Sequence, residues 1–349
     1  MLTCDIVIPV WNRLEDTRDC VESIERNTLF PYRLIIIDNA SGEKAAAYLR
    51  DLAERRHERV LLVKNEKNEG FVKAVNYGIS LSKSEFVCIL NNDTLVAYGW
   101  LGEMVKVIDK NPSIGIVNPT SNTLGQKIGR EIAYTSAEKN KARIKKESGL
   151  FVDLGSAFGF CMLVRKKVFD EIGLLDQVYG MGNFDDTDFS LRAKKKGYKT
   201  VRSFASLVYH KEQRSFNLIK SFGSDFRKNR AIFESRWGAT ERVIVVMRSI
   251  NEKSINQLEE ILDKHAKEKS WVYVISPRLK TKSFYEKYSN LTFYHFKKPF
   301  YISAFLKIIF KKKKPNIIYA DDERFLDFMG KFRFFHRATV HNINAFSEK

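Results

Sequence analysis

The chain has 349 residues, of which 44% are hydrophobic, and it carries a formal net charge of +18. This length allows two domains, and the composition is that of a folded globular protein, which excludes a long disordered or low-complexity chain. The longest apolar runs, such as Arg242–Met247, are far shorter than the roughly 18 residues of a membrane-spanning helix, and the first residues lack the basic leader of a signal peptide.

The first 110 residues alternate between strand and helix patterns. Runs of β-branched residues predict strands, and apolar residues at helical spacing predict helices between them. Three consecutive strand–helix units with short connections predict right-handed crossovers and a mostly parallel sheet covered by helices. The predicted strands are Asp5–Val10, Arg33–Asp38, Val60–Lys64 and Glu85–Leu90, and the predicted helices are Leu14–Asn27, Glu43–Arg56 and a segment from Gly70 to about Ser82.

Beyond residue 100 the pattern is less regular. Residues 118–150 are polar and rich in charge, which predicts a mobile excursion. Gly155–Val164 is interpreted as a strand with glycines at its entrance. The other predicted elements are a helix over residues 100–110, a strand at Ile114–Val117, helices at Lys166–Ile172 and Asp185–Lys196, an extended run at Lys199–Val208, a polar loop at His210–Phe216 and helical residues up to about Trp237.

A composition break near Gly238 divides the chain into a first domain, residues 1–240, and a second, smaller α/β domain, residues 241–349. Asp321–Glu323 is interpreted as the acidic N-terminus of a helix. The other predicted elements of the second domain are strands at Val243–Met247, Trp271–Ile275, Leu291–Phe296 and Asn316–Ala320, and a helix over Ser254–Glu268.

The positive charge is concentrated in the second domain, where 22 Lys and Arg stand against 12 Asp and Glu from Glu241 onward. Such an excess favours nucleic acid, an anionic membrane surface or anionic substrates as partners. The apolar run Phe300–Phe310 followed by Lys311–Lys314 is typical of an amphipathic membrane-surface segment, but equally of a buried helix that ends in a solvated lysine turn. The four cysteines are widely spaced and form neither a zinc pattern nor a disulfide framework, which favours a reducing cytoplasm.

Four polar clusters follow the predicted strands of the first domain. The carboxyl ends of parallel strands meet at one edge of a sheet, so we expect these clusters to converge there. A carboxylate at such an edge can hold Mg²⁺ or Mn²⁺, the usual partner of a diphosphate, although Asn-Asn-Asp is also good turn chemistry. Asp38 can accept hydrogen bonds from a nucleobase or ribose, or can serve as a turn or helix-cap carboxylate. The clusters are Trp11–Arg13, Asp38–Asn39, Asn68–Gly70 and Asn91–Asp93.

Two further clusters carry titratable groups. Asp185–Asp188 opens a predicted helix, and adjacent carboxylates there push their pKa values apart, so that one of them can act as a general base. The same acids also suit the first turn of a helix, and the last of them is spaced for a surface ion pair with Arg192. His210 precedes Lys211 and Arg214; a neutral imidazole binds Mn²⁺, and the neighbouring cations suit phosphates.

In this order, the clusters resemble a family 2 inverting glycosyltransferase of the rhamnosyltransferase-like branch, with a GT-A type, Rossmann-like fold. The resemblance covers about residues 3–216 and leaves the second domain unassigned. It implies a hexosyl- or deoxyhexosyltransferase that uses Mn²⁺ or Mg²⁺ and moves a sugar from a UDP- or dTDP-sugar to an acceptor hydroxyl, in the biosynthesis of cell-surface polysaccharide or glycoconjugate. The matching segments are Asp5–Asn12, Ile36–Ser41, Asn65–Asn76, Leu90–Thr94, Gly155–Val164, Asp185–Arg192 and Tyr209–His210.

The resemblance also implies roles for single residues. Asp186 is the catalytic base with Asp185 beside it. Asp93 is the metal-binding carboxylate of an Asp-X-Asp motif whose first position is Asn91 here, so metal binding rests on Asp93 and His210. Asp38 contacts the base, and the Lys211–Arg214 stretch approaches the diphosphate. The remaining residues expected at the nucleotide-sugar site are Pro9, Val10, Trp11, Asn12, Asn68, Gly70 and Asn92.

Three alternatives remain beside this interpretation. One is a catalytically silent homologue, and another is a basic adaptor for nucleic acid or membrane, which would bind polyanions without sugar specificity. The third is a sugar-nucleotide nucleotidyltransferase, but that class carries a Gly-rich basic loop where this chain has Trp11–Arg13. We expect a nucleotide-diphosphate sugar and a glycan, lipid-linked or glycoprotein acceptor as partners, no nucleic acid, and a cytoplasmic location with peripheral contact at the inner face of the cell membrane left open.

Overall fold

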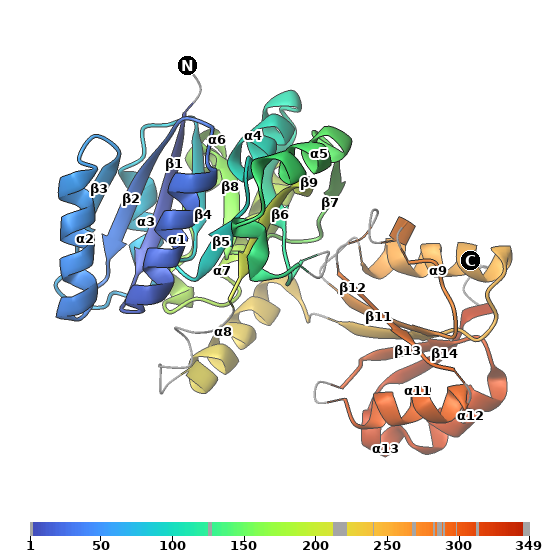
Figure 1. Ribbon diagram of the computed structural model, residues 1–349. Helices are drawn as coiled ribbons and strands as arrows, with labels where there is room; N and C mark the ends of the chain where they lie inside the picture. The colour runs from blue at the N-terminus through green and yellow to red at the C-terminus, as the bar shows by residue number, and fades with distance from the viewer. Residues whose placement is uncertain are drawn as a thin grey trace. The chain divides into compact units, whose positions relative to one another are not determined.

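The computed structural model describes residues 3–124, 128–211, 222–239, 241–266, 270–281, 283–284, 288, 290–297, 299–311 and 314–344. The chain forms two compact units (Figure 1): residues 1–152 with 156–237, and residues 238–349 with 153–155. The assignment of residues 1–240 and 241–349 to separate domains remains a prediction.

The elements of the first unit alternate as the sequence predicts over its first 110 residues. The bounds of Leu14–Asn27 and Val60–Lys64 are those predicted, and most of the others differ by one or two residues. The elements are β1 (Cys4–Val10), α1 (Leu14–Asn27), β2 (Tyr32–Asp38), α2 (Glu43–Arg55), β3 (Val60–Lys64), α3 (Phe71–Ser80), β4 (Phe86–Leu90), β5 (Thr94–Val96), α4 (Trp100–Lys110), β6 (Ile114–Thr120), η1 (Arg130–Ala133), α5 (Ala137–Glu147), β7 (Phe151–Asp153), β8 (Cys161–Arg165), α6 (Lys166–Ile172), η2 (Gln177–Tyr179), α7 (Asp185–Lys195), β9 (Lys199–His210) and α8 (Phe222–Trp237).

Within the described residues, the strands of the first unit form one sheet in the order β3-β2-β1-β4-β8-β6-β9-β5, and β7 pairs with β9. The pairs β1–β2, β2–β3, β1–β4 and β6–β9 are parallel, whereas β8 and β5 pair antiparallel with their neighbours. Ile6 and Ile8 pack into one core with α1, α2 and α4, and Val7 packs into the other with α3, α6, α7 and α8. The predicted mostly parallel sheet with helices on both faces is confirmed.

Two predictions between residues 118 and 160 are wrong. The charge-rich segment contains the helix α5, because Ser136 caps its first turn, Arg143 pairs with Glu147 at i,i+4 spacing, and Arg143 also donates to the carbonyl of Phe204. The predicted strand Gly155–Val164 begins only at Cys161, and residues 155–160 form a loop.

Pro9 marks a change in pairing at the carboxyl end of β1. β1 pairs with β2 as far as Val10, but its pairing with β4 ends at Val7. Because proline has no N–H to donate to a ladder, it suits the position where β1 and β4 part. This is the point at which the order of the strands reverses, where open α/β sheets bind ligands.

The second unit is a smaller parallel sheet in the order β12-β11-β10-β13-β14, as far as its described residues show. One core joins the sheet to α9, and the core on the opposite face joins it to α11 and α12 (Figure 1). Asp322 caps α12 by accepting from the N–H of Phe325, so the predicted acidic N-terminus is confirmed. The elements are β10 (Arg242–Val246), α9 (Glu252–His265), β11 (Trp271–Ser276), β12 (Leu291–His295), α11 (Phe300–Ile309), β13 (Ile317–Ala320), α12 (Glu323–Lys331), α13 (Arg333–His336) and β14 (Thr339–Asn342).

None of the helices in the described part of the chain has the length and apolar character needed to cross a membrane.

Candidate functional site

A cavity of about 330 Å³ lies where several elements of the first unit begin or end. β4 ends beside it, α3 and α7 begin at it, and β9 reaches it with its last residue. It therefore gathers four predicted site residues from segments that are far apart in the sequence. Its lining is Phe71, Asn91, Thr123, Phe158, Gly159, Phe160, Gly182, Asn183, Asp185, Asp186 and His210.

The pairing of β5 with β9 brings Asp93 and His210 together. Thr94 lies opposite His210 in the ladder, and the N–H of Lys211 donates to the carbonyl of Asp93. The Oδ1 of Asp93 lies 3.2 Å from the Nε2 of His210, and the imidazole stacks on the ring of Phe160 with centroids 5.0 Å apart. Two predicted metal ligands thus meet through backbone pairing between positions 117 residues apart.

Asn91 and Asp93 each have a buried oxygen that makes no hydrogen bond within the described structure. Asn91 Oδ1 has no partner there, and Asp93 Oδ1 has only the 3.2 Å contact with Nε2 of His210. Buried polar atoms normally find a partner, so such atoms indicate a place where a ligand or ion completes the bonding. Carboxylate and amide oxygens beside an imidazole are donors that suit Mg²⁺ or Mn²⁺.

These donors fall short of a complete protein cage. Among the residues that the structure describes, no three His, Cys, Asp or Glu side chains are grouped to hold a metal ion. With asparagine at position 91, the local charge comes from one carboxylate, Asp93. Mg²⁺ usually takes one or two carboxylates together with phosphate oxygens and water, and this donor set fits that pattern.

A strained turn presents Asp185 and Asp186. Asn183 and Phe184 have φ values of 72° and 70°, a left-handed conformation that non-glycine residues rarely adopt. Phe184 packs against Phe226 and Phe233 of α8, which holds the turn in place.

α8 also fixes the chain before this turn. The side-chain amide of Asn229 is buried and donates to the carbonyls of Tyr179 and Gly182, each at 2.8 Å. The two carboxylates are therefore presented by a turn that both packing and hydrogen bonds support.

The two carboxylates differ in their hydrogen bonds. Asp186 Oδ2 accepts from the N–H of Gly159 at 2.7 Å, and its Oδ1 accepts from the N–H of Thr187 at 2.7 Å. Burial raises the pKa of Asp186 above its ordinary value, and these bonds counteract part of that rise. Burial raises the pKa of Asp185 as well, and the neighbouring charge of Asp186 raises it further. A pair with raised pKa values can accept a proton near neutral pH.

Asp188 forms the predicted ion pair with Arg192, but its carboxylate lies inside the protein rather than at the surface. The pair is present at 2.9 Å, but the carboxylate is 1% exposed. It also accepts from the indole N–H of Trp237 at 2.8 Å. Asp188 therefore connects α7 to the end of α8, and its role is structural. Asp185 and Asp186 are the carboxylates that line the cavity.

The loops after β1, β2 and β3 are joined by hydrogen bonds. Asp38 Oδ1 accepts from the N–H of Ser41 at 2.8 Å, which is the turn contact considered as the alternative to base binding. Asn12 Oδ1 accepts from the N–H of Gly42. Asn68 Oδ1 accepts from the side chain of Asn39 and from the N–H of Gly70. These residues converge as predicted, and much of their hydrogen-bonding capacity is used within the protein.

Gly70 starts α3 in a conformation that requires glycine. Its φ is +88°, and a Cβ there would lie 3.0 Å from the carbonyl oxygen of Gly180. The loop after β3 therefore packs directly on the loop that leads to the two carboxylates.

Two residues expected at the nucleotide site point elsewhere. The side chain of Val10 is fully buried in the core between the sheet and α1, which leaves only its backbone to line a ligand site. Asn92 is buried and donates to the hydroxyl of Thr17 on α1 at 2.9 Å. Pro9 and Trp11 are half-buried.

Lys211 is engaged by α1. Its ammonium lies 2.9 Å from Asp16 and 2.7 Å from Asp19, its side chain is 9% exposed, and these acids raise its pKa. The ammonium of Lys211 is thus paired with carboxylates in this structure and would have to leave them to contact a diphosphate, as predicted. Arg214 lies outside the described residues.

The cavity lining contains residues that the sequence did not single out for a site. Phe71, Thr123 and Phe158 have no distinctive neighbours in the sequence, and the loop before β8 was predicted as strand. The glycine at position 159, next to two phenylalanines, was the available signal for a backbone N–H exposed to a ligand or carboxylate.

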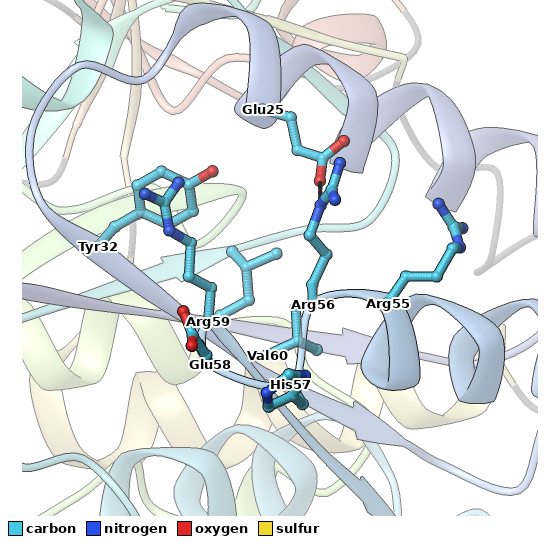
Figure 2. Close-up of a pocket in the computed structure, with 9 residues that line it drawn as sticks. Glu25, Tyr32, Arg55, Arg56, His57, Glu58, Arg59 and Val60 are labelled. Atoms are coloured by element: carbon cyan, nitrogen blue, oxygen red, sulfur yellow. Dashed lines mark hydrogen bonds and ion pairs between the residues drawn. The ribbon is translucent and has the colours of Figure 1, made fainter.

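A second cavity, of about 430 Å³, lies at the opposite edge of the sheet, where β2 and β3 begin. Figure 2 shows Arg56 directed at Glu25, with which it pairs at 2.8 Å. Arg55 pairs with Asp51 at 2.7 Å. No described side chain that lines this second cavity has a buried oxygen without a hydrogen bond, in contrast to Asn91 at the first cavity.

Comparison with known proteins shows what the first unit is similar to. Residues 5–173 match the family model Glycosyl transferase family 2. The chain is 29% identical over 210 residues to the uncharacterized glycosyltransferase YwdF of Bacillus subtilis, covering 58% of this chain and 72% of that protein. It is 24% identical over 223 residues to the uncharacterized protein y4gI of Sinorhizobium fredii, covering 60% of this chain and 24% of that protein.

Among solved structures, the chain is similar to the crystal structure of GalNAc-T7 with UDP, GalNAc and Mn²⁺. The TM-score is 0.50 at 20% identity, and the match covers 60% of this chain and 43% of the other. At this identity the likeness shows a GT-A type fold. The chain spans about a quarter of y4gI and less than half of GalNAc-T7.

Proposed function

We propose that this chain, which carries a family 2 glycosyltransferase domain matched over residues 5–173, transfers a sugar from a UDP- or dTDP-sugar to an acceptor hydroxyl with inversion at the anomeric carbon. The family and the GT-A type fold support glycosyl transfer. One observation carries the finer proposal: a single cavity is lined by Asn91, His210 and the Asp185–Asp186 pair. This combination of donors suited to a metal with carboxylates suited to proton transfer supports the proposal.

We propose Mn²⁺ or Mg²⁺ as the cofactor. GalNAc-T7, which shares the fold, was solved with UDP and Mn²⁺. Asp93 and His210 would hold the ion here, with the amide oxygen of Asn91 beside them. The contact between Asp93 and His210 and the unbonded buried oxygen of Asn91 support this assignment. A divalent cation bound there supplies charge stabilisation to the departing diphosphate.

The Asp185–Asp186 pair supplies the base in this proposal. Asp186 takes the proton from the acceptor hydroxyl, and the hydroxyl oxygen bonds to the anomeric carbon as the bond from that carbon to the diphosphate breaks. The N–H groups of Gly159 and Thr187 fix the orientation of the carboxylate. Asp185 raises the basicity of the pair by repulsion between like charges. The nucleoside diphosphate leaves on the opposite face, which gives inversion.

The acceptor and the pathway belong to the same proposal. A hexose or deoxyhexose would be transferred to a glycan, a lipid-linked acceptor or a glycoprotein in the synthesis of cell-surface polysaccharide or glycoconjugate. We propose that the protein works in the cytoplasm, at the inner face of the cell membrane.

The testing experiment measures release of nucleotide from a panel of UDP-, dTDP- and GDP-sugars, with Mn²⁺ and with a chelator. We expect release from UDP- or dTDP-sugars that requires the metal. Preference for GDP-sugars would overturn the donor assignment, and full release in chelator would overturn the metal assignment. No release and no nucleotide binding under any condition would favour a catalytically silent homologue.

A further inference from the structure

The helices on one face of the second sheet expose large apolar side chains. Phe334 is 82% exposed, Phe310 80% and Ile302 60%. Monomeric soluble proteins seldom leave contiguous apolar surface of this kind in water without a function for it. The set, named here the aromatic face, consists of Ile302, Phe305, Leu306, Phe310, Phe328, Phe332, Phe334 and Phe335.

The members of the aromatic face form one continuous surface. Ile302, Leu306 and Phe310 recur at i,i+4 spacing along the outer side of α11 and its C-terminal cap. Phe305, one turn from Ile302, lies against Phe328 and Phe332, with ring centroids 5.0 and 5.1 Å apart.

The surface continues from Phe332 to the end of α13. The ring of Phe332 lies 6.2 Å from that of Phe335, which lies 5.7 Å from that of Phe334. The face therefore runs from α11 across α12 to α13.

The most exposed members of the aromatic face are not part of the core of the second unit, although Phe305 packs partly against that core. α11 buries Phe300, Ala304 and Ile308 against the sheet, and α12 buries Phe325 and Met329. The exposed residues lie on the other side of the same helices. Their apolar character therefore calls for a partner outside the second unit.

Basic side chains are interleaved with the aromatic face. Lys331, Arg333 and Arg337 are exposed, and none of them forms an ion pair within the described part of the chain. No acid occurs between Phe328 and Arg337 in the sequence.

Other lysines nearby have contacts within the protein. Lys307 and Lys311 lie over the rings of Tyr294 and Tyr273, at 4.2 and 3.4 Å from their centroids. The basic side chains without an ion pair among the described residues here, Lys331, Arg333 and Arg337, thus lie in and around α13, beside the most exposed rings.

We propose that the aromatic face docks on the surface of an anionic lipid bilayer. Phe310, Phe334 and Phe335 enter the boundary between headgroups and acyl chains, while Lys331 and Arg333 contact anionic headgroups. Charge complementarity favours this occupant over a second copy of the chain, because an isologous contact would bring like-charged residues together. This inference rests on the proposed location at the inner face of the cell membrane and does not depend on the sugar-transfer chemistry.

The test is cosedimentation of the full chain with vesicles of phosphatidylcholine alone and of phosphatidylcholine with phosphatidylglycerol. We expect binding to the anionic vesicles that weakens with salt. Phe334→Ser with Phe335→Ser should lower the partition coefficient about tenfold or more, because two exposed rings lose their transfer into the bilayer. The matched control, Leu29→Ser, alters a side chain of the first unit that is 66% exposed, and should leave binding unchanged.

A second pair of variants separates charge from apolar contact. Lys331→Glu with Arg333→Glu should abolish binding, whereas Lys44→Glu with Lys83→Glu makes the same charge change on exposed residues of the first unit and should retain most of it. Circular dichroism checks that each variant is folded.

Two results would overturn the inference. The first is that the serine variant and the glutamate variant of the aromatic face both sediment with anionic vesicles as fully as the wild type. The second is a lack of vesicle binding together with a concentration-dependent dimer that the serine variant abolishes, which would assign the face to a second copy. If the serine variant does not fold, the two charge variants and the salt dependence decide.

Discussion

The two sheets of this protein use acidic residues after their strands in opposite ways. In the second unit, Asp321 follows β13 and accepts from the N–H groups of Arg248 and Ser249, both at 2.8 Å. In the first unit, Asn91 and Asp93 follow β4 and keep buried oxygens without hydrogen bonds, next to a cavity. One oxygen of Asp321 is also unbonded, but no histidine or second buried acid is grouped with it among the described residues.

This difference shows that sheet topology only decides where strand ends lie. A strand end can bind a ligand when its polar atoms have not already been used to close the loop beside it. The predictions below test this contrast, beginning with the largest expected effect.

Replacing Asp186 with asparagine should produce the largest loss. We expect turnover to fall about 10²–10⁴-fold, the usual contribution of a general base, with nucleotide binding nearly intact. Single-turnover transfer and calorimetric titration with UDP measure the two quantities. Asp170→Asn changes an exposed acid on α6 and serves as the control. Unchanged turnover in the Asp186 variant would remove that residue from the role of base.

Removing Asp93 and His210 together should abolish the metal dependence of nucleotide binding. In the double alanine variant we expect Mn²⁺ to tighten UDP binding about 100-fold less than in the wild type. The reason is that the described residues contain no group of three His, Cys, Asp or Glu side chains that could hold the ion without this pair. Calorimetry with and without Mn²⁺ gives the ratio. A matched variant, Asp170→Ala with His57→Ala, removes one exposed acid and one exposed histidine and should keep the wild-type ratio. Equal metal dependence in both variants would count against the site.

Asp185→Asn should stabilise the protein in a pH-dependent manner. The raised pKa of Asp185 means that the folded state keeps a proton which the unfolded state has released. Stability from this group is therefore complete at pH values below about 4 and is lost as the pH rises through the folded pKa. The variant should melt above the wild type at pH 8 and show no such gain at pH 4. A shift of the same size at both pH values would argue against ionisation as its origin.

Asp321→Ala should have the smallest effect, and it should be local. Two backbone N–H groups lose a charged acceptor, but the burial that raises the pKa of Asp321 offsets part of the loss, which leaves about 1 kcal/mol. Hydrogen exchange at Arg248 and Ser249 should accelerate, while nucleotide binding by the first unit should not change. Weaker nucleotide binding in this variant would mean that both strand edges contribute to ligand binding.

Much of the first unit could be predicted because local signals and the final fold agree there. α1 has the bounds that its apolar spacing predicts, and β3 has the bounds of its β-branched run. The charge-rich α5 lacks this agreement. Its Ser136 cap and Arg143–Glu147 pair are local helix signals, but it buries no apolar side chain, and Arg143 also donates to a carbonyl 61 residues further along the chain.

The candidate site also has parts that could be predicted from the sequence and parts that could not. The order of the polar clusters along the chain predicted a site that contains Asp93, Asp185–Asp186 and His210. That order could not predict where the side chains of Val10 and Lys211 point. Val10 alternates toward the core because of the period of its strand. Lys211 finds its acidic partners nearly 200 residues earlier in the sequence, on a helix whose orientation depends on the whole sheet.

The pairing of β5 with β9 has a consequence for how this site tolerates insertions and deletions. His210 reaches Asp93 because it lies opposite Thr94, and the pairing of β6 with β9 already contains an irregularity between Pro119 and Thr120. Side chains alternate between the faces of a strand, so removal of one residue from the end of β9 would turn the imidazole to the other face while leaving the sheet paired. The length of β9 is therefore constrained more tightly than its composition, and descendants of this chain can lose the site through a single deletion without losing the fold.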